Sequence, residues 1–114
     1  MIDCIFCQIA NHEIDATIVY EDEEIIAFED IDPQAPVHVL VVPKKHIHTL
    51  IDLKENEGEI LEQLVGVAKT VAVMKHVDHR GFRFVLNCNP EGGQTVYHLH
   101  AHVLGGRKMN WPPG

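Results

Sequence analysis

The stretch TVYHLHAHVLGG, residues 95–106, carries three histidines at alternate positions: His98, His100 and His102. Alternate side chains of a β-strand point to the same face of a sheet, so this spacing predicts a strand with all three histidines on one face. The residues that alternate with them are apolar: Leu99, Ala101 and Val103. This alternation is typical of a strand with one side on a core, and it leaves the histidines on an open face or in a cleft.

The rest of the chain predicts an α+β fold built on an antiparallel sheet. We expect a short helix over residues 5–11, a hairpin over 17–30, and strands over 36–46 and 81–89. Apolar residues spaced three and four apart predict one long amphipathic helix over residues 55–76. Short turns between strands indicate a meander of about five strands, with the long helix on its buried face. Residues 1–114 show no repeat or linker, and we expect a single domain.

The charge and hydropathy of the chain exclude several classes of partner. The sequence has 17 acidic and 9 basic residues and a formal net charge of -8. Binding to a nucleic-acid backbone relies on clustered Lys and Arg, so we expect no nucleic-acid partner. Apolar stretches such as residues 39–42 are far shorter than the roughly 18 residues of a membrane span. The N-terminus does not resemble a secretory leader, so we expect a cytoplasmic protein without a membrane partner.

Three cysteines make a full disulfide framework impossible and favour a reducing compartment or a metal. Cys4 and Cys7 form a C-x-x-C pair, whereas Cys88 stands alone and is expected to be a small buried residue in a strand. A zinc ion on Cys4 and Cys7 would need two histidines to complete four ligands. The candidates are His46 and one end of the segment from His98 to His102.

The alternating histidines admit two chemical interpretations. The first is a catalytic zinc ion held by histidines with one coordination position open. The second is nucleophilic catalysis by an imidazole whose neighbours tune its protonation and hold a phosphate. A neutral imidazole is a good nucleophile near pH 7, because its unperturbed pKa is about 6.5.

The motif HLHAHV, residues 98–103, follows the pattern His-apolar-His-apolar-His-apolar, and the chain resembles the histidine triad (HIT) family of nucleotide-binding proteins. The resemblance extends over CIFCQI (4–9), residues 20–47, VLNCNPEGGQTVYHLHAHVLGG (85–106) and the terminal WPPG. It is strongest to the branch that hydrolyses purine nucleoside phosphoramidates. The implied fold is HIT-like, with the sheet extended across a homodimer and the WPPG tail reaching the partner's active site.

The resemblance also implies a role for each candidate site residue. His100 matches the nucleophile, and His38, His98 and His102 match the side chains that surround it. Thr95 and His102 are candidate proton donors to the leaving amine. The residues implied near the phosphate are Asn87, Gly92, Gly93, Gln94 and Thr95, with His100 and His102. The residues implied around the nucleoside are Asp30 at the ribose hydroxyls and Phe6, Ile14, Phe28 and Ile31 at the base.

Members of the family differ in whether they bind zinc. Some members hold zinc through ligands that match Cys4, Cys7, His46 and His98, whereas relatives with the same WPPG tail lack both cysteines and work without metal. This chain combines the cysteines with that tail, which predicts one structural zinc ion per chain. One departure from the family pattern is Asp15, where relatives often have proline, and it affects the edge of the base pocket.

The activity that the resemblance implies is cleavage of the phosphorus–nitrogen bond of adenosine 5′-phosphoramidates, through a histidine-adenylate, to AMP and an amine. A nucleotidyl transferase is disfavoured, since that branch usually replaces the last triad histidine, here His102, by glutamine. A dinucleoside polyphosphate hydrolase and a nucleotide-binding regulatory or interaction module remain as alternatives. The sequence leaves open the identity of the amine and the preference for adenine or guanine.

Overall fold

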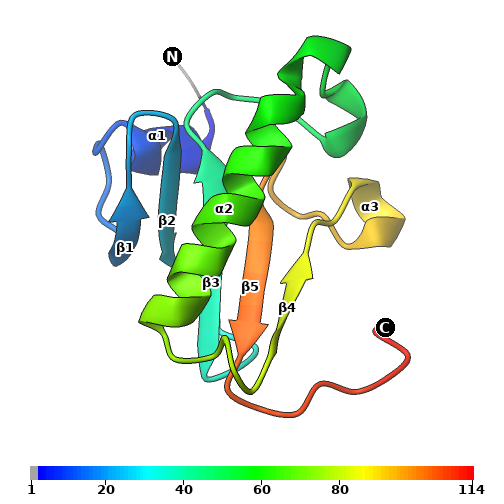
Figure 1. Ribbon diagram of the computed structural model, residues 1–114. Coiled ribbons are helices and arrows are strands. Elements are labelled where there is room, and N and C mark those ends of the chain that lie inside the picture. Colours follow the sequence, from blue (N-terminus) through cyan, green and yellow to red (C-terminus); the bar gives the residue numbers. More distant parts are fainter. Residues whose placement is uncertain (1–2) are drawn as a thin grey trace.

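The computed structural model describes residues 3–114 and has a five-stranded sheet at its centre, in which all neighbouring strands are antiparallel (Figure 1). The strands are β1 (Ile18–Glu21), β2 (Ile25–Glu29), β3 (Val37–Pro43), β4 (Phe82–Val85) and β5 (Ala101–Gly105). The helices are α1 (Ile5–Ala10), α2 (Gly58–Met74) and α3 (Asn89–Gly92). The predicted α+β class, with five antiparallel strands, one long helix and a short N-terminal helix, is confirmed.

The strand order departs from the predicted meander in its second half. The order is β1-β2-β3-β5-β4, so the last strand lies between β3 and β4. Because β3 and β4 are both antiparallel to β5, they run parallel to each other. Parallel strands cannot be joined by a tight turn and need a long crossover, which α2 supplies here. The crossover leaves room for β5, and this strand therefore has a neighbour on each side.

The two faces of the sheet are covered by different helices. One face packs against α2 through a core that includes Ala27, Val39 and Val41, together with Leu64 and Val71 of the helix. The alternate residues of the same strands point the other way and pack against α1 in a second apolar cluster. The members of this cluster are Phe6, Ile9, Ala10, Ile26, Phe28, Leu40 and Val42. The site described below lies on this second face.

The histidine segment is only partly a strand, which corrects one expectation. β5 begins at Ala101, so His98 and His100 lie in the irregular segment that leads into it. Continuing the β3–β5 register would put Leu99 opposite Pro43, whose nitrogen carries no hydrogen for a ladder. The Leu99 N–H donates instead to the Ile47 carbonyl at 2.6 Å. Leu99 still packs in the α2-side core, as the alternation predicted.

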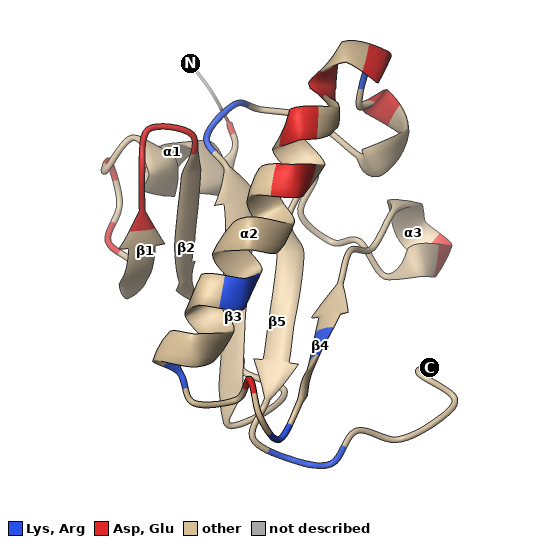
Figure 2. Ribbon diagram, viewed as in Figure 1, with Lys and Arg blue, Asp and Glu red and all other residues tan. Residues whose placement is uncertain are grey.

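Charged side chains are distributed unevenly along the molecule (Figure 2). Most acidic residues gather around the β1–β2 turn and the start of α2, whereas basic residues gather where α2 ends, β4 begins and the C-terminal tail runs. Within the described part of the chain, no helix has the length and apolar character that crossing a membrane requires.

Candidate functional site

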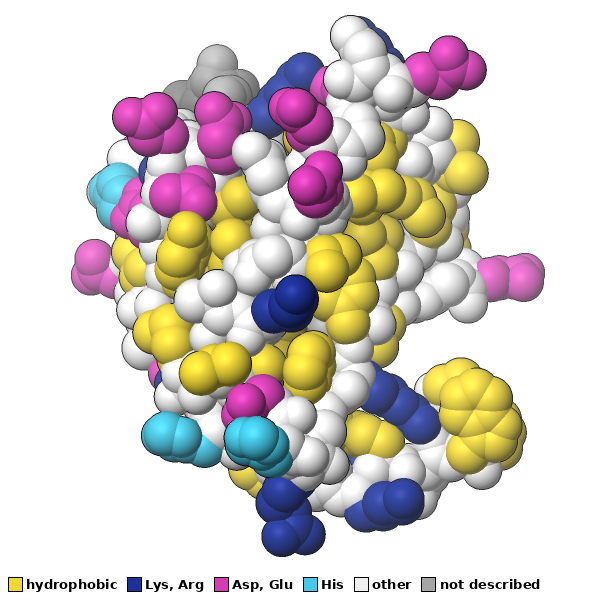
Figure 3. All heavy atoms as spheres, in the orientation of Figure 1, with side chains coloured by type: hydrophobic (Ala, Val, Ile, Leu, Met, Phe, Trp, Pro, Cys, Tyr) yellow, Lys and Arg dark blue, Asp and Glu magenta, His cyan; other side chains and the backbone are white. Residues whose placement is uncertain are grey.

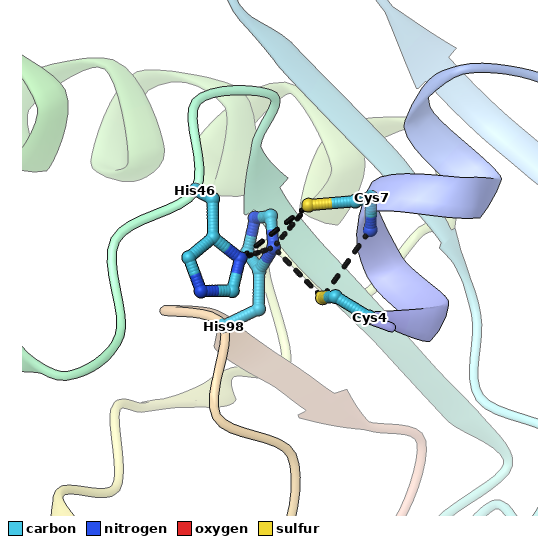
Figure 4. A group of neighbouring side chains, drawn as sticks. All are labelled: Cys4, Cys7, His46 and His98. Carbon is cyan, nitrogen blue, oxygen red and sulfur yellow. Dashed lines mark hydrogen bonds between the residues drawn. The ribbon is translucent and has the colours of Figure 1, made fainter. Parts of the chain in front are cut away.

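Two cysteines and two histidines converge where α1 begins (Figure 4). Cys4 and Cys7 come from α1 and the residue before it, His46 follows β3, and His98 precedes β5. His98 Nδ1 lies 3.3 Å from Cys4 Sγ, 3.5 Å from Cys7 Sγ and 3.1 Å from His46 Nδ1. The four potential ligand atoms all lie within 4.8 Å of one another. The geometry thus joins the C-x-x-C pair to the two histidines that the family resemblance implied.

The hydrogen bonds of His98 suit a metal ligand. Its Nε2–H donates to the Pro43 carbonyl at 2.7 Å, so the Nδ1 lone pair points at the two sulfur atoms. Metal-binding histidines usually donate their second N–H to a carbonyl or carboxylate in this way. Two thiolates and two imidazoles are a set that tetrahedral zinc prefers, and four protein ligands leave no position open. These residues therefore fit a closed, structural zinc site.

The cysteines differ in their surroundings. Burial, reinforced by the neighbouring Cys4, raises the pKa of the Cys7 thiol to about 11, so a metal would have to displace its proton. Cys88 lies apart from the cluster, half-buried, directly before α3. It was expected within a strand, but β4 ends at Val85.

A second group, Asp30, His38 and His102, forms a directed chain of hydrogen bonds. The backbone N–H of Gln34 donates to His38 Nδ1 at 3.0 Å, which puts the proton of the neutral ring on Nε2. That N–H donates to His102 Nδ1 at 2.9 Å, while Asp30 Oδ2 lies 3.5 Å from the same nitrogen. His102 consequently carries its own proton on Nε2. These tautomers follow from the donors and acceptors around each ring.

This second group does not suit a metal, although its atoms are close enough together. A metal on His38 Nε2 would require the ring proton to move to Nδ1, where it would face the Gln34 N–H. Two donors would then oppose each other, whereas the equivalent nitrogen of His98 has a carbonyl partner. The structure thus separates a cluster that could hold a metal from a group of histidines that remains available for chemistry.

His100 lies between the two groups and is held in one tautomer. Its Nδ1–H donates to the His98 carbonyl at 2.8 Å, which leaves an unprotonated Nε2. The ring stands edge-on to Phe6, with centroids 5.0 Å apart, and only 6% of the residue is exposed. Burial lowers the pKa of His100 and of His38, and it lowers that of His102 to about 4. The three rings are therefore neutral at pH 7.

The loop before the histidine segment is braced from within. The Gln94 side chain is buried, accepts from the Asn89 N–H at 2.9 Å and donates to the carbonyls of His48 and Val96. Gly93 has a φ of +90°, which favours glycine, and a Cβ there would lie 3.7 Å from Asn87 Nδ2. The Gln94 amide was predicted near a phosphate, and in the structure its hydrogen bonds hold the loop.

Thr95 and Gly92 lie at the surface. Thr95 is exposed and lines a cavity together with Cys4 and His46. Gly92 ends α3 and is also exposed. His102 does not line that cavity.

A separate cavity of about 570 Å³ opens beside Asp30 and His38, and Ile31 and Asp15 also line it. Its volume lies within the usual range of small-molecule sites, roughly 300–1,000 Å³. The four residues predicted at the base divide into two pairs. Phe6 and Phe28 are buried against each other with ring centroids 5.4 Å apart, whereas Ile14 and Ile31 are exposed.

Sequence reasoning missed the residues that contribute only backbone atoms. The Gln34 N–H sets the tautomer of His38, and the Pro43 carbonyl sets that of His98. No side-chain pattern could have identified them, because every residue except proline offers the same N–H and every residue the same carbonyl.

The chain is similar to several known proteins over nearly its whole length. The family model described as scavenger mRNA decapping enzyme C-term binding matches residues 3–111. A 14 kDa zinc-binding protein of Brassica juncea is 48% identical over 114 residues, which cover 98% of this chain and 100% of that protein. Adenylylsulfatase HINT1 of Arabidopsis thaliana is 46% identical, over 96% of this chain and 76% of that protein. A crystal structure of a HIT family hydrolase from Legionella pneumophila Philadelphia 1 superposes with a TM-score of 0.96 at 51% identity, covering 98% of this chain and 100% of that chain.

Proposed function

The chain belongs to the histidine triad (HIT) family, and on that premise we propose that it acts as one HIT domain and hydrolyses purine nucleoside 5′-phosphoramidates to a nucleoside monophosphate and an amine. The reaction proceeds through a covalent nucleotidyl intermediate on His100. Hydrolase activity is in keeping with the HIT family hydrolase that superposes on 98% of the chain. Because its thiols must stay reduced to bind metal, we expect the protein in the cytoplasm.

The observation that carries this proposal is the fixed tautomer of His100. Donation from Nδ1–H to the His98 carbonyl leaves the Nε2 lone pair free to attack phosphorus. Attack also makes the ring cationic, and the same carbonyl then stabilises the charge on Nδ1–H. A nucleophile that is already neutral and oriented needs no separate general base at pH 7.

The chemistry proceeds in two balanced steps. In the first, a bond forms between His100 Nε2 and phosphorus, the phosphorus–nitrogen bond breaks, and the amine leaves with one added proton. The candidate donors of that proton are His102 Nε2–H and the Thr95 hydroxyl. In the second step water attacks phosphorus, the bond to His100 breaks, and the water's proton returns to the donor.

The hydrogen-bond chain from Gln34 through His38 puts the proton of His102 on Nε2, the ring nitrogen that does not face His38. From there it can donate to a phosphoryl oxygen as negative charge develops. Asp30 borders the cavity beside these rings, where a carboxylate can accept hydrogen bonds from ribose hydroxyls. This cavity is our proposed nucleoside site, and Ile31 and Asp15 lie at its edge.

We further propose that the cluster of Cys4, Cys7, His46 and His98 binds one zinc ion with a structural role. When bound, the metal supplies a cross-link between α1 and the segments that follow β3 and precede β5. His98 belongs to both sites, since its ring faces the cluster and its carbonyl holds His100. The zinc-binding relative in Brassica juncea supports this assignment.

The exposed apolar surface supports a homodimer. β4 is an edge strand with unpaired backbone groups, and Phe84 on it is 38% exposed. Val65 of α2 is 47% exposed, and Figure 3 shows apolar side chains gathered between α2 and β4. We propose that two chains pair at this edge, with the tail that carries Trp111 near the partner's site.

The decisive experiment traps the intermediate. Wild-type protein mixed briefly with an adenosine phosphoramidate and quenched should carry an adenylate on His100, detected by mass spectrometry. His100→Ala should lose roughly 10³-fold or more in kcat and still bind AMP, because only the covalent step is removed. The control is His79→Ala, whose exposed ring lies outside the site. No adenylate together with near-normal turnover in His100→Ala would refute the mechanism, and AMP binding without any turnover in wild type would indicate a binding module.

A further inference from the structure

Two adjoining cavities lie at the end of the sheet where α2 ends and the C-terminal tail begins. Each has a volume of about 260 Å³, and both are lined by Arg80, Gly81, Arg107 and Lys108. Arg83 lines the second cavity, and no aspartate or glutamate lines either. We call the side chains of Arg80, Arg83, Arg107 and Lys108 the basic surface.

Within the described chain, three of the five lysines outside the basic surface pair with an acidic residue, whereas the cations of the basic surface do not. Lys44, Lys45 and Lys75 each pair with a glutamate. Among residues 3–114, none of the four cations of the basic surface forms an ion pair with a carboxylate. The nearby Asp78 faces His79. In a chain with 17 acidic and 9 basic residues, four unpaired cations in one place leave a strong local positive potential.

Part of the basic surface is held in position by the backbone. The Arg107 guanidinium donates to the carbonyls of Gln34 and Lys108, and the Arg83 guanidinium donates to the Asn110 carbonyl. These bonds orient the two groups without neutralising their charge. The side chains of Arg80 and Lys108 have no such bond within the described chain, so their donors remain for a ligand.

The size and charge of the basic surface point to a small multivalent anion. Each cavity is below the roughly 300–1,000 Å³ of typical sites for drug-sized molecules, which is too small for a whole nucleotide. Two cavities that share their cations suit two linked anionic groups, and guanidinium groups match phosphate oxygens in geometry. We propose that the basic surface binds a diphosphate group, either as inorganic pyrophosphate or as the diphosphate of a nucleotide.

The test measures pyrophosphate binding by calorimetry on the full-length, metal-loaded protein in phosphate-free buffer, with the nucleotide site saturated by AMP. The double variant Arg80→Ala with Lys108→Ala should weaken binding by about tenfold or more, because it removes the free donors. Lys54→Ala with Lys69→Ala removes the same charge outside the basic surface and should retain near-wild-type affinity. Arg80→Lys with Lys108→Arg keeps both charges and should restore most of the binding. Arg107 is unsuitable for this test, since it also holds Gln34 beside His38.

Each outcome of the calorimetry either supports or overturns the proposal. Absence of pyrophosphate binding, or equal loss in the two alanine pairs, would overturn the proposal, and so would competitive displacement of pyrophosphate by AMP. Selective loss in the Arg80 and Lys108 variant supports it. Titration with ADP under the same conditions then identifies the source of the diphosphate. Displacement of pyrophosphate by ADP indicates that the basic surface accepts the diphosphate of a nucleotide, and no displacement indicates inorganic pyrophosphate. None of these outcomes depends on turnover at His100.

Discussion

Removal of metal from the cluster of Cys4, Cys7, His46 and His98 should lower the thermal stability of the protein without unfolding it. Helix α1 is only six residues long, and an isolated helix of that length is not stable. It nevertheless buries Phe6 and Ile9 against the sheet. Two buried apolar side chains contribute about 3–6 kcal/mol together, so α1 should stay docked after chelation.

The size of the expected change follows from binding linkage. With free zinc at about 100 to 1,000 times the dissociation constant, the bound metal adds about 2.7–4.1 kcal/mol to the free energy of unfolding. For a chain of this length each kcal/mol shifts the melting temperature by roughly 4 °C. Chelation should therefore lower the melting temperature by roughly 10–16 °C and leave turnover at 25 °C largely intact.

The assay is thermal unfolding followed by far-ultraviolet circular dichroism, with metal content measured on the same samples. Cys4→Ala should lose the metal and melt near the temperature of the chelated wild type. Cys88→Ala is the matched control, because this cysteine lies outside the cluster, and it should retain both metal and stability. An unchanged melting temperature after verified metal loss would refute a structural role, and loss of turnover with the fold intact would indicate a catalytic metal.

Three further predictions concern other parts of the molecule. Burial lowers the pKa of His102 to about 4, against about 6.5 in an unfolded chain. The unfolded state therefore takes up the proton first as the pH decreases, and the free energy of unfolding should fall from about pH 6.5 to about pH 4. Urea midpoints of His102→Gln should vary less over that window, and parallel curves would contradict this reasoning. Gln94→Ala should cost about 1–3 kcal/mol, because it leaves three backbone groups without partners, while Gln63→Ala on α2 should be near neutral in the same urea titration. Deletion of residues 110–114 should change amine selectivity in turnover assays more than AMP affinity, and a monomer in light scattering at micromolar concentration would argue against the dimer.

Local patterns in the sequence predicted the elements of the fold well. Alternation around Leu99 and Val103 correctly assigned these residues to the α2-side core, because burial of every second residue is a local property of the chain. The spacing of apolar residues likewise predicted the long helix. The strand order could not be obtained in this way. The last strand can pair with both β3 and β4 or with β4 alone, and the path of the crossover decides between these orders. The residues of the strands themselves do not indicate that path.

The candidate site was predictable in its side chains but not in its protonation. The cluster of Cys4, Cys7, His46 and His98 forms as the family resemblance implied. The tautomers depend instead on backbone groups brought close by tertiary folding, such as the Gln34 N–H and the Pro43 carbonyl. The start of β5 also depends on a residue in another strand, since Pro43 cannot donate to the ladder.

Trp111 is the single tryptophan of the chain, and at 83% exposure it lies on the tail and not in the core. The Arg83 guanidinium carbon lies 6.0 Å from the centroid of its ring. Intrinsic fluorescence excited at the indole will therefore report hydrated tryptophan in a folded single chain, and a conventional fluorescence melt of the monomer will nearly miss the unfolding of the sheet. The same property makes the indole a built-in reporter of the tail, because its emission should shift to the blue when a second subunit covers it.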